Sequence, residues 1–150
     1  MPEHIALDKV ESTLKELVEI LHGNHEGFKE LGHRLQDSKA KRLFLKETQR
    51  RAEFAAELEN ELHRMGVHDV KADTSYKAKA RHLWGEIQAS LAGGQKALLS
   101  TAVKGDNAAN EAYASALKLK LPLPLREMLD RQRAHIERSH DELKALHDLG

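Results

Sequence analysis

Three Glu-x-x-His motifs give this chain residues that could bind metal. They are Glu19-Ile-Leu-His22, Glu30-Leu-Gly-His33 and Glu137-Arg-Ser-His140. On a helix, residues three positions apart lie on one face, so each motif presents a carboxylate and an imidazole together. Di-metal centres between helices use two such motifs and a further glutamate from each of two other helices. Because the chain has ten histidines, some of these motifs are expected to arise by chance.

Two other segments offer carboxylates but no such motif. Glu53 and Glu57 lie on one of them, where Ala56 stands at the position for a paired histidine, and Asp106 lies on the next. His140 is the best single candidate because it falls in the apolar stripe of its own segment. A histidine in such a stripe is more often a hydrogen-bonded part of the core than a ligand. Spacing alone therefore does not decide whether these residues bind a metal.

Four long amphipathic patterns position these residues. They cover 4–35, 38–66, 95–120 and 124–149. In each, apolar residues recur every three or four positions, which is typical of a bundle helix. The short turn at Asp37 and Ser38 makes the first two helices antiparallel neighbours.

A shorter helical pattern lies between the second and third long ones, near residues 75–91. At about 25 Å it is long enough to carry the chain back along the bundle. Two helical hairpins joined by a long connection is the ferritin-like layout. The sequence therefore predicts an all-α, ferritin-like four-helix bundle with a crossover helix, in a single domain over residues 1–150.

Several polar residues share a register with the core leucines and predict a polar layer inside the bundle. They are Asn24 or His25, Glu47, Arg51, Asp106, Gln132 and His140. Distances from the turns place His25 near the level of Arg51, and Asp106 near that of His140. Buried ionic groups are costly unless they are paired or bind metal. We expect either a hydrogen-bonded structural layer or a metal site, and favour the first.

The composition excludes several classes of function. The 24 basic residues balance the 24 acidic ones, and aromatic residues make up 4 %, which argues against a nucleic-acid partner. The absence of cysteine excludes disulfides and thiolate chemistry. No apolar run approaches the roughly 20 residues of a membrane span, and no signal peptide is evident. We expect a cytoplasmic protein with no membrane insertion.

Short stretches along nearly the whole chain carry a resemblance to a known family. They are Leu21–Phe28, Gln49–Leu58, His82-Leu83-Trp84, Gly93-Gly94, Gly105–Ala109, Tyr113, Leu121-Pro122, Arg131-Gln132 and His140-Asp141. Their order and spacing resemble the bacterial ferritin-like family called domain of unknown function 2383. The resemblance implies an up-and-down bundle with a crossover helix, in bacteria, with a loose link to stress responses. It implies no reaction.

The resemblance also implies a set of metal candidates. Glu57 and His140 match residues typical of the family, while His22 stands where it usually has Asp and Asp106 where it usually has Glu. These four could converge between the helices around iron, zinc or manganese, with Glu137 as a further candidate. The missing histidine on the second helix argues against a standard di-iron oxidase.

We expect a bacterial, stress-associated protein that is not an enzyme. It would act through oligomerisation, as a homodimer, or through binding a protein partner. The alternative is a metal-binding ferritin-like protein with a di-iron or mixed-metal centre and redox or storage activity.

Overall fold

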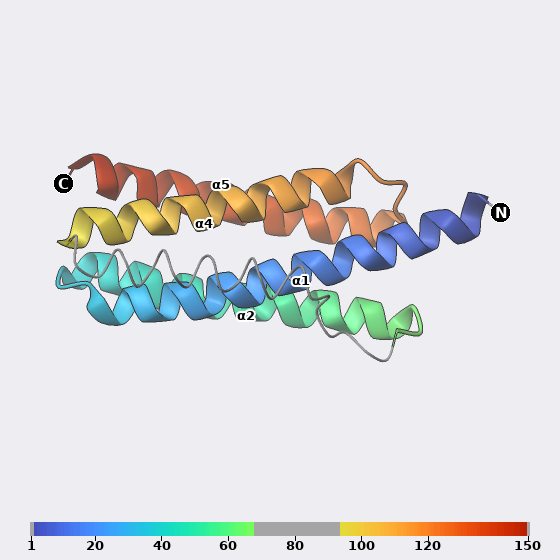
Figure 1. The fold of residues 1–150 in the computed structure, drawn as a ribbon, viewed down its shortest axis with the longest axis horizontal. Coiled ribbons are helices and arrows are strands. Elements are labelled where there is room, and N and C mark those ends of the chain that lie inside the picture. The colour runs from blue at the N-terminus through green and yellow to red at the C-terminus, as the bar shows by residue number, and fades with distance from the viewer. Residues whose placement is uncertain (1, 68–93, 150) are drawn as a thin grey trace.

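Four long helices form the part of the chain that the computed structural model describes, residues 2–67 and 94–149 (Figure 1). They are α1 (Pro2–Arg34), α2 (Ser38–Arg64), α4 (Gly94–Leu117) and α5 (Leu123–Leu149). Within these ranges there is no strand, so the prediction of an all-α bundle of four long helices is confirmed. The predicted crossover helix near 75–91 lies outside the described residues.

Local sequence signals set the helix ends. The Asp37 side chain accepts a hydrogen bond from the Ala40 N–H at 2.8 Å and caps the start of α2. Gly66 follows the end of α2 with a φ of 89°, a left-handed conformation that favours glycine. The third long helix ends at Leu117, three residues earlier than its apolar pattern predicts.

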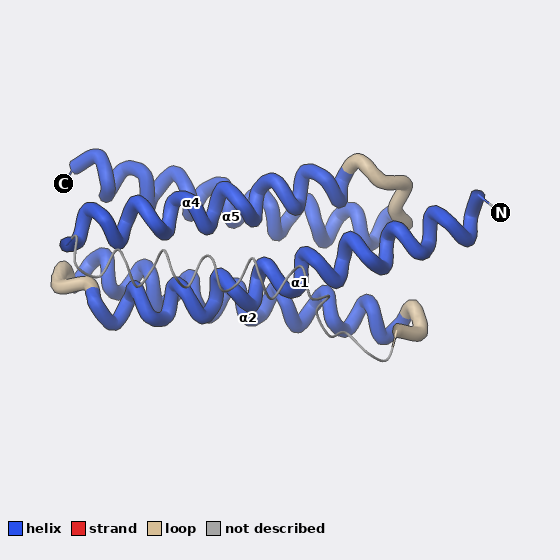
Figure 2. The backbone as a smooth tube through the Cα atoms, in the orientation of Figure 1, coloured by secondary structure: helices blue, strands red, loops and turns tan. Residues whose placement is uncertain are grey.

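The helices form two antiparallel hairpins that pack on each other. Helix α1 packs closely on α2 and on α4, α4 packs on α5, and α2 and α5 are the least closely packed of these four neighbouring pairs. Figure 2 shows the α1–α2 turn at one end of the bundle and the α4–α5 loop at the other. Helix α2 ends at the opposite end of the bundle from the start of α4 (Figure 2). No described helix is long and apolar enough to cross a membrane.

The apolar core is divided into two clusters along the bundle. The larger cluster includes Leu14, Leu17, Leu21, Phe54, Leu58, Leu62, Tyr113, Leu129 and Ile136. The smaller includes Phe28, Leu31, Phe44, Leu99, Ala102 and Leu143. On every helix the two clusters are separated by a buried polar residue: Asn24 on α1, Glu47 and Arg51 on α2, Asp106 on α4 and Ser139 on α5. The predicted polar layer is therefore a band between two apolar cores.

Arg126, near the start of α5, closes the α4–α5 loop. Its Nη1 donates to the Leu117 carbonyl at 3.1 Å and its Nη2 donates to the Leu119 carbonyl at 2.8 Å. The last carbonyls of a helix have no partner within the helix, so this guanidinium caps the end of α4.

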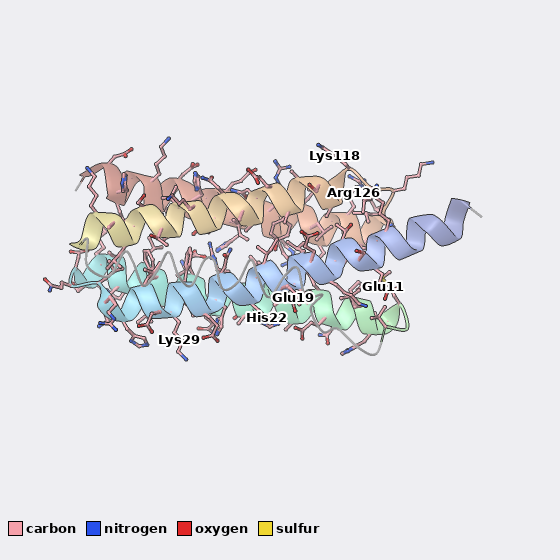
Figure 3. The ribbon with its side chains drawn as sticks, viewed as in Figure 1. Glu11, Glu19, His22, Lys29, Lys118 and Arg126 are labelled. Atoms are coloured by element: carbon pink, nitrogen blue, oxygen red, sulfur yellow. The ribbon has the colours of Figure 1, made fainter. Side chains whose placement is uncertain are left out.

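Replacing Arg126 with Gln should lower the free energy of unfolding by about 1–3 kcal/mol, because two hydrogen bonds from a charged donor are lost. Lys118→Gln is the matched control, since Lys118 is an exposed cation near the same loop (Figure 3), and should change stability by less than about 0.5 kcal/mol. Urea unfolding measures both. An Arg126→Gln midpoint equal to that of the parent would contradict the capping role.

Candidate functional site

The buried guanidinium of Arg51 is the centre of the polar band. The side chain is fully buried. Its Nη1 donates to Glu47 Oε2 at 2.5 Å, and its Nη2 donates to Asp106 Oδ1 at 2.6 Å. Nη2 also lies 3.2 Å from Ser139 Oγ, to which it donates a weaker hydrogen bond. One cation therefore connects α2, α4 and α5.

Helix α1 contacts this cation through an aromatic ring. The Cζ atom of Arg51 lies 4.4 Å from the ring centroid of Phe28 on α1, a cation–π contact. Phe28 in turn stacks on Phe44, with 5.2 Å between ring centroids. All four described helices thus supply a contact to Arg51.

Glu47 carries the network outward to the surface. His135 Nε2 lies 2.9 Å from Glu47 Oε2 and 3.0 Å from Oε1, so it donates to this carboxylate. The His135 side chain is 21 % exposed and its ring packs edge-on against Phe54. The hydrogen-bonded chain runs from solvent through His135 and Glu47 to Arg51 and Asp106.

Asp106 lies at the inner end of this chain. Burial raises the pKa of its carboxyl, because the charged form loses its hydration. Arg51 lowers the pKa most strongly and His140 lowers it further, whereas the negative charge of Glu47 raises it. A single guanidinium faces two carboxylates here, so the second charge is not fully compensated. Asp106 Oδ2 makes no hydrogen bond with the described protein atoms.

Weaker polar contacts surround the network. His25 Nδ1 donates to the Thr48 carbonyl at 2.9 Å, which brings α1 against α2 one turn before Arg51. Asn24 Nδ2 lies 3.3 Å from the Gly105 carbonyl and donates to it across α1 and α4. A Cβ atom on Gly105 would lie 3.4 Å from the Asn24 side chain. Further along the bundle, the Tyr113 hydroxyl donates to Gln132 Oε1 at 2.7 Å, and burial raises the Tyr113 pKa.

The structure does not bring the metal candidates together. His22 lies on the outer side of the α1–α2 hairpin and donates to Glu59 at 2.6 Å (Figure 3). Glu57 accepts a hydrogen bond from Arg131 at 2.6 Å. The further candidate Glu137 pairs with Arg133 on the surface of α5.

The other two candidates lie closer to each other. Asp106 bonds to Arg51, and half-buried His140 acts on it electrostatically. Within residues 2–67 and 94–149, no three His, Asp or Glu side chains form a group suited to a metal ion.

The donor set at the centre of the bundle does not fit a di-metal centre. The two buried carboxylates that face the interior, Glu47 and Asp106, are both hydrogen-bonded to the fixed cation Arg51. A metal ion there would face the repulsion of the guanidinium and would compete with it for the same oxygens. The sequence-based metal site stays a prediction that this geometry does not support.

Helical periodicity explains most of the candidates' positions. Residues at intervals of three, four and seven share a face, so Leu58 follows Arg51 on the buried side and Glu57 lies to one side of it. On α5, Ser139 lies three residues after Ile136 and is buried, whereas His140 is only half-buried. The sequence pattern places His140 in the buried stripe of α5, but the buried residue is Ser139, one position earlier. Ser139 could have been found from this spacing, but His135 lies on the flank of α5 and had no such signal.

Replacing Arg51 with Met should lower the free energy of unfolding by about 3–5 kcal/mol, because two buried carboxylates lose their cation. The neighbouring Arg50 pairs with Glu53 on the surface, so Arg50→Met should cost no more than about 1 kcal/mol. Chemical denaturation of both variants measures the difference. Replacing Glu47, Arg51 and Asp106 together with apolar residues should restore most of the loss; equal costs for the two single variants would contradict the central role of Arg51.

Asp106 should make stability depend on pH in an unusual direction. Because its pKa in the folded protein lies above that in the unfolded chain, the folded state holds the proton more tightly. The stability of the parent relative to Asp106→Asn should therefore fall as the pH rises from about 4 towards the raised pKa, by at most about 1.4 kcal/mol per pH unit. Denaturation across this pH range measures it, with Asp141→Asn, an exposed acid on α5, as the control. A relative stability that rises over the same range would contradict the raised pKa.

Comparison with known proteins agrees with the resemblance seen in the sequence. A search of curated proteins finds no match to this chain. One family profile, described as Domain of unknown function (DUF2383), matches residues 9–119, which include most of α1 and the whole of α2 and α4. That match covers well over half of the 150 residues, and the chain belongs to this family.

Proposed function

We propose that this protein is a non-catalytic helical-bundle protein that acts through oligomerisation or by binding a protein partner. The whole chain, residues 1–150, would form a single domain in the bacterial cytoplasm and be associated with stress. The bacterial origin, the location and the stress association rest on the family resemblance and the composition. The absence of catalysis is supported by the structure of the bundle interior.

The observation that carries this proposal is the ionic network around Arg51, in which both buried carboxylates are bonded to the same cation. A catalytic or metal centre in a bundle needs several polar groups that are free to bind a substrate or an ion. Here Glu47 and Asp106 both engage Arg51, and Phe28 covers the guanidinium. The buried polar groups are used to hold the helices together.

The space beside this network also supports the proposal. A cavity of about 10 Å³ lies between α1 and α4, next to Asn24, Phe28 and Gly105. That volume holds about one water molecule, whereas pockets for small ligands measure about 300–1,000 Å³. The cavity is too small for an organic substrate, so an active role is better sought on the outer surface.

Elemental analysis tests the proposal against the metal-binding alternative. Protein purified without a histidine tag, from cells given iron, zinc and manganese, should contain far less than one metal ion per chain. Its melting temperature should not change when a chelator is added, because no ligand would be removed from the folded state.

The opposite result would favour a storage or redox protein. Near-stoichiometric metal that is lost in Asp106→Asn or His140→Ala, but kept in the control His147→Ala, would overturn the proposal. His147 is a suitable control because it lies near the end of α5 and its own contact is with the neighbouring Asp148.

A further inference from the structure

The outer surface of the α1–α2 hairpin has opposite charges at its two ends. The half next to the α1–α2 turn, residues 26–50, has seven basic and three acidic residues that are at least partly exposed. The other half, residues 9–25 and 52–66, has seven acidic and three basic residues of this kind, although one of the acids, Glu57, faces α5 and pairs with Arg131. We call these the basic half and the acidic half. Figure 3 places Glu11 towards the end where α1 begins, Glu19 close to the middle of the bundle, and Lys29 towards the opposite end.

This polarity is confined to one hairpin. On the α4–α5 hairpin, the half formed by residues 94–107 and 137–148 has four exposed or partly exposed residues of each sign. The half formed by residues 108–136 has five basic and three acidic. Among the residues whose exposure the structure describes, the charge separation therefore lies along α1 and α2, although the net charge of the whole chain is balanced.

The helix dipole of α2 opposes the charge of the basic half. The first turn of α2 has no acidic residue and contains Lys39 and Lys41, followed by Arg42. Positive charge at a helix N-terminus is unfavourable, because the helix dipole is positive there. The turn also brings this end of α2 beside the basic end of α1, where His33 and Arg34 lie. Like charges therefore meet across the hairpin.

Most cations of the basic half have no partner within the described structure. Arg34 pairs with Glu30 and Arg50 pairs with Glu53. The remaining five have no carboxylate within 4 Å in the described ranges; they are Lys29, Lys39, Lys41, Arg42 and Lys46. They are available to an acidic surface from outside the molecule.

We propose that two copies of this chain pair through their α1–α2 faces in antiparallel orientation. The two-fold axis would lie in the plane of the interface and perpendicular to the helix axes. It would place the basic half of each copy on the acidic half of the other. The same patch then serves both subunits, as an isologous interface requires. An axis parallel to the helices would instead bring like charges together, which is disfavoured. This inference rests on the proposed function, since it names the partner in the oligomerisation.

The face is large enough for a stable dimer. Helix α2 has 27 residues, so it is about 40 Å long. Two such helices side by side offer roughly 800 Å² per copy, the size of a standard interface. Leu45 adds an apolar contact to this face, because it lies against Gly32 of α1 and is still 41 % exposed.

Paired charge reversals test the orientation. The first variant changes Lys39, Arg42 and Lys46 to Glu, and the second changes Glu11, Glu53 and Glu59 to Lys. In the proposed dimer each variant alone would oppose like charges, so its dissociation constant should rise by about 100-fold or more. An equimolar mixture should form a heterodimer with nearly the affinity of the parent. Sedimentation equilibrium of the full chain measures these constants, and circular dichroism checks that each variant is folded.

The control carries three reversals on the other hairpin: Lys104, Arg138 and Lys144 to Glu. It should dimerise like the parent. The parent dimer should weaken by at least about tenfold when salt is raised from roughly 0.05 to 0.5 M, because exposed charges are screened.

Three results would overturn the inference. Variants that dimerise normally, or a mixture that does not recover affinity, would show that another face forms the dimer and would leave the proposed function standing. A parent chain that stays monomeric at about 100 μM, where a micromolar dimer would be largely formed, would exclude self-association. The metal analysis would then decide separately whether the proposed function survives.

Discussion

The arrangement of the four helices depends on the burial of one positive charge. A guanidinium removed from water is strongly destabilising unless its donors are satisfied and its charge is balanced. For Arg51, charge balance and partners for both Nη atoms are supplied where Glu47, Asp106, Ser139 and Phe28 come to the same level of the bundle, while Nε has no hydrogen-bond partner among the described residues. These groups belong to four different helices. A shift of α2 or α4 by one turn would leave charge unpaired in the core, and a shift of α1 or α5 would remove the Phe28 or Ser139 contact. The network therefore specifies register, much as a single buried asparagine does in a coiled coil.

The apolar residues have a complementary role. The two core clusters supply the burial that drives folding, and they contact all four helices on both sides of the polar band. Apolar packing alone tolerates many substitutions and small slips of register. A polar band between two apolar layers makes one register of the helices far more stable than the neighbouring registers. The band costs desolvation free energy, and the raised pKa of Asp106 is a consequence of that desolvation.

The buried network and the charged surface of the α1–α2 hairpin lie in different parts of the molecule. The cavity beside the Arg51 network, between α1 and α4, holds about one water molecule. On the surface of the described residues, the strongest irregularity in charge is the separation along α1 and α2. The same short turn that makes these helices antiparallel places their basic ends together, so the fold itself creates a charged patch that each helix alone would not have.

The chain's own periodicity determined the four long helices and identified most of the buried polar residues. Asn24, Glu47, Arg51 and Asp106 recur at the spacing of the core leucines, and all are buried because a helix repeats its face every three to four residues. Only the tertiary structure decided the partners. Asp106 bonds to Arg51, although its distance from the turn had suggested His140.

Each such pairing joins residues far apart in sequence. It depends on the rotation and lateral placement of whole helices. These cannot be predicted from the periodicity along a single helix.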